Sequence, residues 1–246
     1  MRLAVIPARY ASTRFPGKPL ADLAGQPLIR RVYLAVERAA VFDKIVVATD
    51  DTRIRDVVEE FGASCVMTAS DHPSGTDRVA EAASHFSDAS IVVNVQGDEP
   101  FVDREALQQL LLAVDSANVD IATLATPIRE EHVLLSPNAV KVTRDARDNA
   151  LYFSRHAIPY LRDIPIGRWL QEGRHWQHVG IYAFRSGVLP ELTTLPPADL
   201  ELAESLEQLR WLAAGYRIRV AVTDQPAIGI DTPADLELAA RRFQSS

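Results

Sequence analysis

The chain has 246 residues, of which 47% are hydrophobic and 24% are charged, so it can bury the core of a sizeable globular protein. A formal net charge of −7 argues against a general nucleic-acid-binding protein, and the single cysteine, Cys65, excludes a disulfide framework and a cysteine zinc cluster. No apolar run reaches membrane-spanning length and no secretory leader is recognisable, so we expect a cytoplasmic protein without membrane insertion.

The first predicted strand, residues 3–6, breaks at Pro7 and leads into a loop with prolines, Gly17 and three cations, Arg9, Arg14 and Lys18. Proline removes backbone donors and glycine adopts conformations closed to other residues, so this loop continues neither a sheet nor a helix. Open α/β folds bind ligands at the carboxyl ends of their strands. We therefore expect the loop to hold the phosphates of a nucleoside triphosphate, although it is neither a Walker A loop nor a dinucleotide fingerprint.

Strands and helices are predicted to alternate as far as Pro127. Helical spacing of apolar residues predicts helices that begin at Pro27, about Thr52, after residue 78 and around residue 104. Apolar runs predict strands at residues 44–49, 65–67, 91–95 and 121–125. Strands that are apolar on both faces and alternate with helices indicate a mainly parallel sheet between helix layers.

Beyond Pro127 the pattern changes. We expect a hairpin, a mobile irregular loop, a strand, a helix and a further strand at residues 140–153, 162–174, 179–184, 200–214 and 218–222, and then a final helix capped by Thr232. The chain is thus predicted to be one domain, with a nucleotide-binding core at about 1–127 and 183–246 and a lobe at about 128–182.

Two aspartates are candidate metal ligands. Asp98 follows a buried strand, where a carboxylate can share Mg²⁺ with substrate phosphates, but an aspartate of a turn or helix start is the structural alternative. For Asp231, just before a helix, this alternative is stronger. In the loop before the third helix, Ser74 and Gly75 could recognise a base or ribose, or Ser74 could cap that helix.

Polar residues of the second half are, taken singly, more often structural than functional. They are Arg155, His178, Tyr182 and Glu204. His178 by itself is typical of a hydrogen-bonded core histidine. Glu207 and Gln208 recur with Glu201 and Glu204 at helical spacing, which usually indicates a solvated helix face.

Motifs spread over nearly the whole chain, taken in order, are more specific than any of these residues. They include IPARYASTRFPGKPL at residues 6–20, SGTDR at 74–78, NVQGDEP at 94–100, HVGIY at 178–182 and GIDTP at 229–233. Together they resemble the 3-deoxy-manno-octulosonate (Kdo) cytidylyltransferase family, also called CMP-Kdo synthetases. Only residues 162–174 match poorly.

The resemblance implies a three-layer α/β/α, Rossmann-like nucleotide-diphospho-sugar transferase fold with a small dimerisation lobe. It also implies Mg²⁺-dependent transfer of CMP from CTP to the anomeric hydroxyl of Kdo, with release of pyrophosphate, by a cytoplasmic homodimer that serves lipopolysaccharide synthesis. No protein nucleophile is needed. A related acidic sugar, 8-amino-Kdo or sialic acid, and a non-catalytic nucleotide-binding regulator remain alternatives.

The resemblance also assigns roles to residues of this chain. The catalytic set is Arg9, Lys18, Asp98 and Asp231, of which the two aspartates hold Mg²⁺. The nucleotide-binding set is Ala8, Arg9, Arg14, Lys18, Ser74, Gly75, Arg78 and Asp98. The sugar-binding set is Gln96, Arg155, His178, Tyr182, Glu204, Glu207 and Gln208, with Arg155 and His178 as partners of the sugar carboxylate.

Overall fold

The computed structural model describes residues 1–11, 15–225 and 229–244, except for the side chain of residue 244. The contacts divide the chain into two compact units, one made of Met1–Leu107 and Ile228–Ser246 and the other of Gln108–Ala227. We call them unit 1 and unit 2. The boundaries of these units differ from those of the predicted core and lobe. The prediction assigns residues 121–127 to the core and most of residues 176–185 to the lobe, but these two strands pair with each other.

Unit 1 is built around β1 (Arg2–Ala8), which pairs in parallel with β2 (Lys44–Thr49) and β4 (Ile91–Asn94). The short strand β3 (Ser64–Met67) pairs in parallel with β2. Val5 lies opposite Val46 on one side and Asn94 on the other. The apolar side chains of residues 3–6 are fully buried, as expected for a central strand of a parallel sheet.

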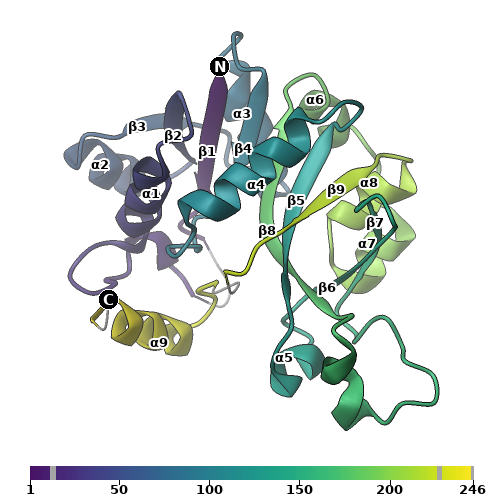
Figure 1. Ribbon diagram of the computed structural model, residues 1–246. Coiled ribbons are helices and arrows are strands. Elements are labelled where there is room, and N and C mark those ends of the chain that lie inside the picture. Colours follow the sequence, from purple (N-terminus) through teal and green to yellow (C-terminus); the bar gives the residue numbers. More distant parts are fainter. Residues whose placement is uncertain (12–14, 226–228, 245–246) are drawn as a thin grey trace. The chain divides into compact units, whose positions relative to one another are not determined.

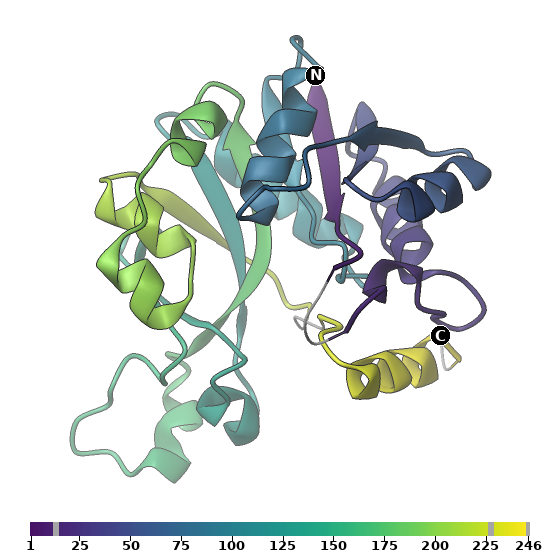
Figure 2. The ribbon, with the colours of Figure 1, turned by 180° about the vertical axis from the view of Figure 1, so that it is seen from behind.

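Helices cover both faces of this parallel sheet. Helix α1 (Leu28–Ala39) lies on one face in Figure 1, and α3 (Gly75–Ser84) lies on the opposite face in Figure 2. In the strand order β3-β2-β1-β4, the strands β1 to β3 are added toward one edge of the sheet, and β4 is then added on the other side of β1. Right-handed crossovers therefore place α3 on the face opposite α1. The strand order therefore switches between β1 and β4, where open α/β sheets place their ligands.

The remaining elements of unit 1 are η1 (Lys18–Leu20), α2 (Thr52–Glu60) and α9 (Pro233–Gln244), while α4 (Arg104–Asp115) crosses from unit 1 into unit 2. As predicted, Thr232 caps α9, since its Oγ1 accepts a hydrogen bond from Asp235 N. The predicted break at Pro7 is wrong, because β1 continues to Ala8. Its pairing with β4 ends at Val5, so the missing N–H of Pro7 interrupts no bond to β4.

Unit 2 contains β5 (Ile121–Pro127), which pairs antiparallel with β8 (Trp176–Arg185) and parallel with β9 (Ile218–Val222). The predicted hairpin is present as β6 (Lys141–Arg144) and β7 (Ala150–Ser154), and β6 joins β8 at Lys141 and Gln177. Short helices complete the unit: α5 (Glu131–Leu135), α6 (Leu189–Thr193), α7 (Asp199–Glu204) and α8 (Gln208–Ala213).

Two predictions for unit 2 are wrong. The single helix expected at residues 200–214 is divided into α7 and α8, because Ser205 adopts a left-handed conformation with φ of 51°. The expected irregular loop at residues 162–174 contains the 3-10 helix η2 (Ile166–Glu172).

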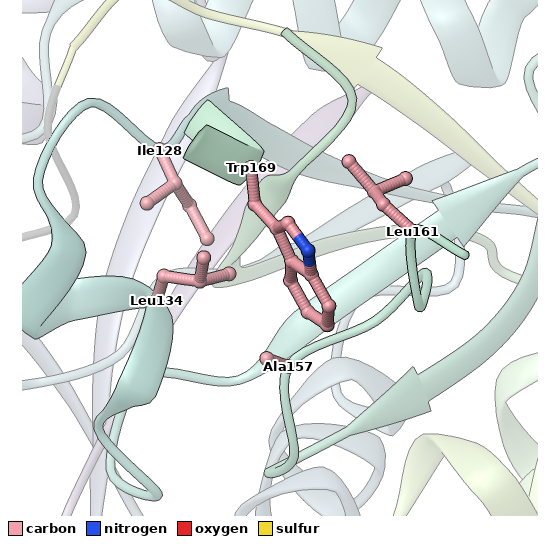
Figure 3. Packing of buried hydrophobic residues seen from close by; sticks show 5 residues of the cluster. All are labelled: Ile128, Leu134, Ala157, Leu161 and Trp169. Carbon is pink, nitrogen blue, oxygen red and sulfur yellow. The ribbon is translucent and has the colours of Figure 1, made fainter. Parts of the chain in front are cut away.

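A small apolar cluster explains why η2 is ordered. Trp169 is only 4% exposed, and its indole N–H donates to Ile164 O at 2.8 Å. Figure 3 shows its ring among the side chains with which it forms a buried cluster, Ile128, Leu134, Ala157 and Leu161. The aromatic area buried by one tryptophan therefore anchors a segment whose glycines and proline indicate a loop.

No helix in the described part of the chain has the length and apolar character to cross a membrane.

Candidate functional site

The site begins where β1 and β4 end side by side. Val95 N donates to Val5 O at 3.0 Å, so the two segments remain in contact just past the end of β4. Two residues later the segments come closer still, because a Cβ atom on Gly97 would lie 2.7 Å from Pro7 O. This separation is shorter than ordinary van der Waals contact, so only glycine fits at that position without moving β1.

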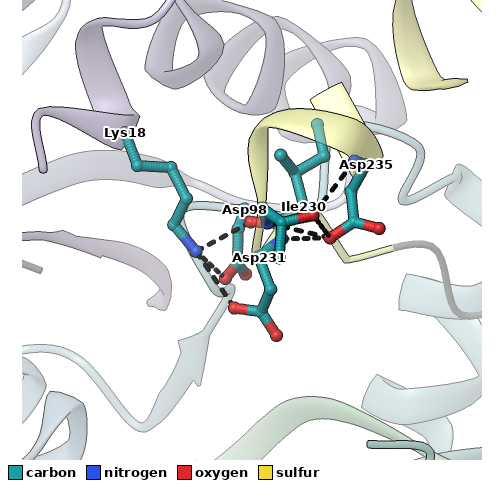
Figure 4. A network of polar contacts seen from close by, with 6 residues as sticks. Lys18, Asp98, Ile230, Asp231 and Asp235 are labelled. Carbon is teal, nitrogen blue, oxygen red and sulfur yellow. Dashed lines mark hydrogen bonds and ion pairs between the residues drawn. The ribbon is translucent and has the colours of Figure 1, made fainter. Parts of the chain in front are cut away.

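Beyond Gly97, two carboxylates from distant parts of the sequence converge on one cation. Lys18 Nζ lies 2.6 Å from Asp98 Oδ2 and 3.4 Å from Asp231 Oδ1, and it also donates to Ile230 O at 2.8 Å. Figure 4 shows the lysine side chain reaching both aspartates. Burial first, and then the charges of the two aspartates, raise the pKa of the adjacent Glu99 to about 8. Glu99 is therefore mostly uncharged at neutral pH.

The backbone of Asp231 is fixed at the start of α9. Ile230 N donates to Asp98 O at 3.0 Å, which joins the two aspartate segments directly. The carboxylate of Asp235 accepts hydrogen bonds from Asp231 N at 3.1 Å and Thr232 N at 2.8 Å (Figure 4). Asp235 and Thr232 thus cap the helix reciprocally and hold Asp231 at its N-terminus. Asp231 therefore lies at a helix N-terminus, as its structural alternative predicts, and its carboxylate also approaches the ammonium that contacts Asp98.

The N-terminus of α3 supplies another wall of the site. Ser74 caps the helix, since its Oγ accepts from Thr76 N at 3.1 Å and from Asp77 N at 3.2 Å. Arg78, one turn further, is buried and donates to Thr68 Oγ1 at 2.5 Å, while its other terminal nitrogen lies 3.2 Å from Asp50 Oδ1. Its guanidinium is therefore held in place by residues that follow β2 and β3.

These elements line a cavity of about 340 Å³ within unit 1. Its walls include most of the residues predicted to bind nucleotide or metal, together with the predicted sugar ligand Gln96: Ala8, Arg9, Lys18, Ser74, Gly75, Arg78, Gln96, Asp98 and Asp231. The predicted residue Arg14 lies outside the described residues. The sequence did not single out His72, Pro73 and Gly97, which also line the cavity; the position of His72, separated from the SGTDR motif only by Pro73, was the available signal.

The other residues predicted to bind sugar lie in unit 2. His178 and Tyr182 both lie on β8 and have ring centroids 5.4 Å apart, and Phe153 packs edge-on against the imidazole. His178 Nε2 lies 3.0 Å from Thr123 Oγ1. Burial lowers the pKa of His178 to about 3, so its imidazole is neutral at neutral pH.

Tyr182 carries a buried hydroxyl. Among the described residues this oxygen has no hydrogen-bond partner of normal geometry. The hydroxyl of the neighbouring Thr123 is already directed at Ile181 O, at 2.9 Å. Burial, followed by the charge of Glu207, raises the pKa of Tyr182 well above its ordinary value.

Arg155 and Glu204 contact each other directly. The Glu204 carboxylate accepts from Arg155 N at 2.9 Å and from Ser154 Oγ at 2.7 Å. Burial raises the pKa of Glu204, but these hydrogen bonds outweigh burial and hold it below its ordinary value. The guanidinium of Arg155 donates to the backbone carbonyls of Pro137, Glu204 and Ser205.

The last two predicted sugar ligands begin α8. Gln208 is buried at the first turn, and Glu207 precedes it as the N-cap residue. The expected solvated face is wrong for Gln208, because the chain turns at Ser205 and points this amide inward. Glu201, on the other side of the turn, is paired with Arg210 at 2.5 Å.

Comparisons with known proteins fit this geometry. A family model described as cytidylyltransferase matches residues 3–218. The solved structure of a CMP:2-keto-3-deoxy-manno-octonic acid synthetase complexed with CTP superposes with a TM-score of 0.91 at 42% identity, covering 100% of this chain and 99% of the other. The fold and the cavity therefore define a nucleotidyltransferase of the cytidylyltransferase class, and the expected three-layer α/β/α fold with a mixed, mainly parallel sheet is confirmed.

Curated relatives narrow the class further. A 3-deoxy-manno-octulosonate cytidylyltransferase from Parabacteroides distasonis is 50% identical over 242 residues, 96% of each chain. One from Porphyromonas gingivalis is 49% identical over 247 residues, 99% of this chain and 96% of the relative. The chain belongs to the 3-deoxy-manno-octulosonate cytidylyltransferase family, as its motifs predicted.

Proposed function

We propose that this chain transfers CMP from CTP to Kdo. The anomeric oxygen of the sugar attacks the α-phosphorus and a new P–O bond forms. The bond from that phosphorus to the bridging oxygen breaks, pyrophosphate leaves with the electron pair, and the sugar hydroxyl loses its proton. The observation that carries the proposal is the convergence of Lys18, Asp98 and Asp231 inside the cavity of unit 1.

The cations of the cavity would act on the phosphates. Arg9 is exposed and lines the cavity, and Lys18 reaches it from η1, so both are available to a triphosphate. Positive charge fixed in advance beside a leaving pyrophosphate stabilises the charge that develops as the bond breaks. We assign this role to Arg9 and Lys18. The assignment of Arg14 as an assisting cation stays a prediction from the sequence.

Asp98 and Asp231 would hold Mg²⁺. Their oxygens already approach one ammonium group, and carboxylate oxygen is the ligand type that this hard cation takes. Among the described residues, no group of three or more His, Cys, Asp and Glu could hold a metal by itself. Two carboxylates suit an ion that keeps water and substrate phosphates as its other ligands. When bound, Mg²⁺ would neutralise phosphate charge and polarise the α-phosphate.

The remaining assignments divide the two substrates. The backbone around Ala8, with Ser74, Gly75 and Arg78, would recognise the cytidine. Kdo would be held by Gln96, Arg155, His178, Tyr182, Glu204, Glu207 and Gln208. Since its buried imidazole is neutral, His178 would bring no positive charge to the sugar carboxylate. We further propose a cytoplasmic homodimer that supplies activated Kdo for lipopolysaccharide synthesis.

The test is pyrophosphate release from CTP with Mg²⁺ and each of three sugars: Kdo, 8-amino-Kdo and sialic acid. We expect turnover with Kdo to exceed that with the others. Asp98→Asn should keep its circular dichroism spectrum and lose about 10²- to 10³-fold in kcat, because one ligand of the charge-stabilising ion is gone. The matched control is Asp163→Asn, at an exposed position with φ of 65° that asparagine tolerates.

Two results would contradict the proposal. An absence of turnover with Kdo would reject the substrate, whatever the other sugars do. A near wild-type rate of Asp98→Asn, with Asp163→Asn also unchanged, would reject the metal assignment.

A further inference from the structure

His72 belongs to the wall of the nucleotide cavity, yet the roles assigned so far make no use of it. It lies in the loop of residues 68–74, which connects β3 to α3. Its side chain is 18% exposed, and its Nε2 contacts the carboxylate of Glu81, which lies on α3 nine positions further along the chain. An imidazole that borders a ligand cavity and is paired with a carboxylate is held in a defined orientation.

Glu81 holds more than the imidazole. Its Oε2 also accepts a hydrogen bond from Ala69 N at 2.9 Å, near the beginning of the same loop. The backbone hydrogen bond and then the contact with His72 lower the pKa of the Glu81 carboxyl, so it is ionised at neutral pH. One carboxylate oxygen therefore connects α3 to two points of the loop.

The ends of the loop are fixed as well. At one end Thr68 N donates to Thr49 O at 2.9 Å, and Thr68 Oγ1 accepts from Arg78. At the other end Ser74 caps α3. Because both ends are held by backbone or capping bonds, Glu81 sets the position of the middle of the loop, where His72 lies. The ring has two nitrogens, and Nε2 is directed at Glu81, which leaves Nδ1 for another partner.

We propose that Glu81 is a positioning residue that holds His72 as a further nucleotide contact, whose Nδ1 forms a hydrogen bond with bound CTP. The identity of the ligand rests on the proposed function. The contact itself depends on the geometry of the loop and on the place of His72 in the cavity wall. Glu81 acts through the imidazole and touches no substrate.

Calorimetric titration with CTP tests this inference without turnover. His72→Ala should weaken CTP binding about 3- to 10-fold, the effect of one lost hydrogen bond. His72→Gln can still reach Glu81 with its terminal amide but has no nitrogen at the Nδ1 position, so it should bind CTP as weakly as the alanine variant. A purely structural histidine would instead be rescued by glutamine.

Glu81→Gln tests the positioning role. It should weaken CTP binding in the wild-type background and have no further effect when combined with His72→Ala, because residues that act through one contact are not additive. Glu60→Gln, at an exposed position near the end of α2, is the control and should leave the affinity unchanged. Thermal unfolding of every variant shows whether the proteins are folded at the titration temperature.

The outcomes separate the two proposals. Wild-type affinity for CTP in His72→Ala or His72→Gln would overturn the contact, and additive losses in the double variant would overturn the role of Glu81. If the wild-type protein binds CTP but does not release pyrophosphate with Kdo, the proposed reaction fails while the inference about His72 stands or falls by the titrations.

Discussion

Lys18 illustrates at the scale of one residue how the site balances its charges. Its ammonium lies 2.6 Å from Asp98 and 3.4 Å from Asp231, where it offsets the repulsion between two carboxylates. In the nucleotide-free protein it therefore competes with a divalent ion for the same oxygens. When a triphosphate is bound, the same ammonium gains phosphate oxygens as partners, and its effect becomes favourable to both ligands.

Lys18→Met should consequently have two effects of opposite sign. Without nucleotide, the variant should bind Mn²⁺ roughly tenfold more tightly, because a neighbouring positive charge has been removed. With CTP and Kdo, its kcat/KM should fall by about 10²- to 10³-fold, because the cation beside the phosphates is lost. Electron paramagnetic resonance measures free Mn²⁺ in the first experiment, and pyrophosphate release measures the second.

Lys44→Met is the matched control for this prediction. Lys44 is also a partly buried lysine of unit 1, but its ammonium donates to Ser64 Oγ at 2.9 Å and is not part of the cavity wall. Neither Mn²⁺ affinity nor kcat/KM should change appreciably. Unchanged or weaker Mn²⁺ binding by Lys18→Met would mean that Asp98 and Asp231 do not form the metal site.

Individual site residues were predictable to different degrees. Motifs identified Lys18, Asp98 and Asp231, but residue spacing alone could not decide between a metal ligand and a turn or cap, since the approach of the two aspartates is a long-range contact. His72 was missed because a single histidine beside a proline is typical of any polar loop. Its partner Glu81 becomes apparent only when α3 is folded against the loop.

At the scale of secondary-structure elements, the site depends on how closely β1 approaches the chain that leaves β4. The Cβ atom of an alanine at position 97 would lie 2.7 Å from Pro7 O, so the end of β1 or the segment that carries Asp98 must move. Gly97→Ala should therefore lower the free energy of unfolding by about 1–3 kcal/mol, the usual cost of overpacking. CTP affinity should fall as well, because Ala8 and Arg9, which line the cavity, directly follow Pro7 in the chain.

Gly187→Ala shows whether a lost glycine matters in itself. A Cβ atom there would meet no heavy atom within 4 Å, and its backbone needs no positive φ. This variant should be as stable as the wild type or slightly more stable, because alanine has less conformational freedom in the unfolded chain. Chemical unfolding and CTP titration apply to both variants. Equal stability of Gly97→Ala and Gly187→Ala would show that the close approach carries no energetic cost.

The order of elements was largely predictable, and the errors have physical causes. Continuous apolar runs predicted every strand that surrounds the site, since central parallel strands are buried on both faces. Pro7 suggested a break, but a strand tolerates proline where its ladder on one side has ended. The division of the predicted helix at Ser205 could not be foreseen, because its flanks keep helical spacing and serine seldom adopts a left-handed conformation.

For the molecule as a whole, the proposed substrates correspond to different units. The described residues assigned to the nucleotide and the metal belong to unit 1, whereas those assigned to the sugar belong to unit 2 apart from Gln96. Their grouping into units follows from tertiary contacts, which neither composition nor periodicity reveals. A substitution in unit 2 that leaves the fold intact should therefore change the kinetics of one substrate and not the binding of the other.

Tyr182→Phe tests this division with a minimal change. Because the buried Tyr182 hydroxyl has no hydrogen bond of normal geometry to the described residues, its removal should leave the free energy of unfolding unchanged or slightly higher. If that hydroxyl instead serves the sugar, the KM for Kdo should rise about 3- to 10-fold while the Kd for CTP stays the same. Steady-state kinetics, CTP titration and chemical unfolding measure the three quantities.

A second tyrosine of unit 2 provides the matched control. The Tyr216 hydroxyl donates to Glu191 Oε2 at 2.7 Å, and neither residue is assigned to the sugar, so Tyr216→Phe should change neither substrate parameter. A Kdo KM that is unaltered in Tyr182→Phe would remove Tyr182 from the sugar site. Equal losses for CTP and Kdo would contradict the division between the units, because a substitution confined to the sugar site has no physical reason to weaken nucleotide binding in unit 1.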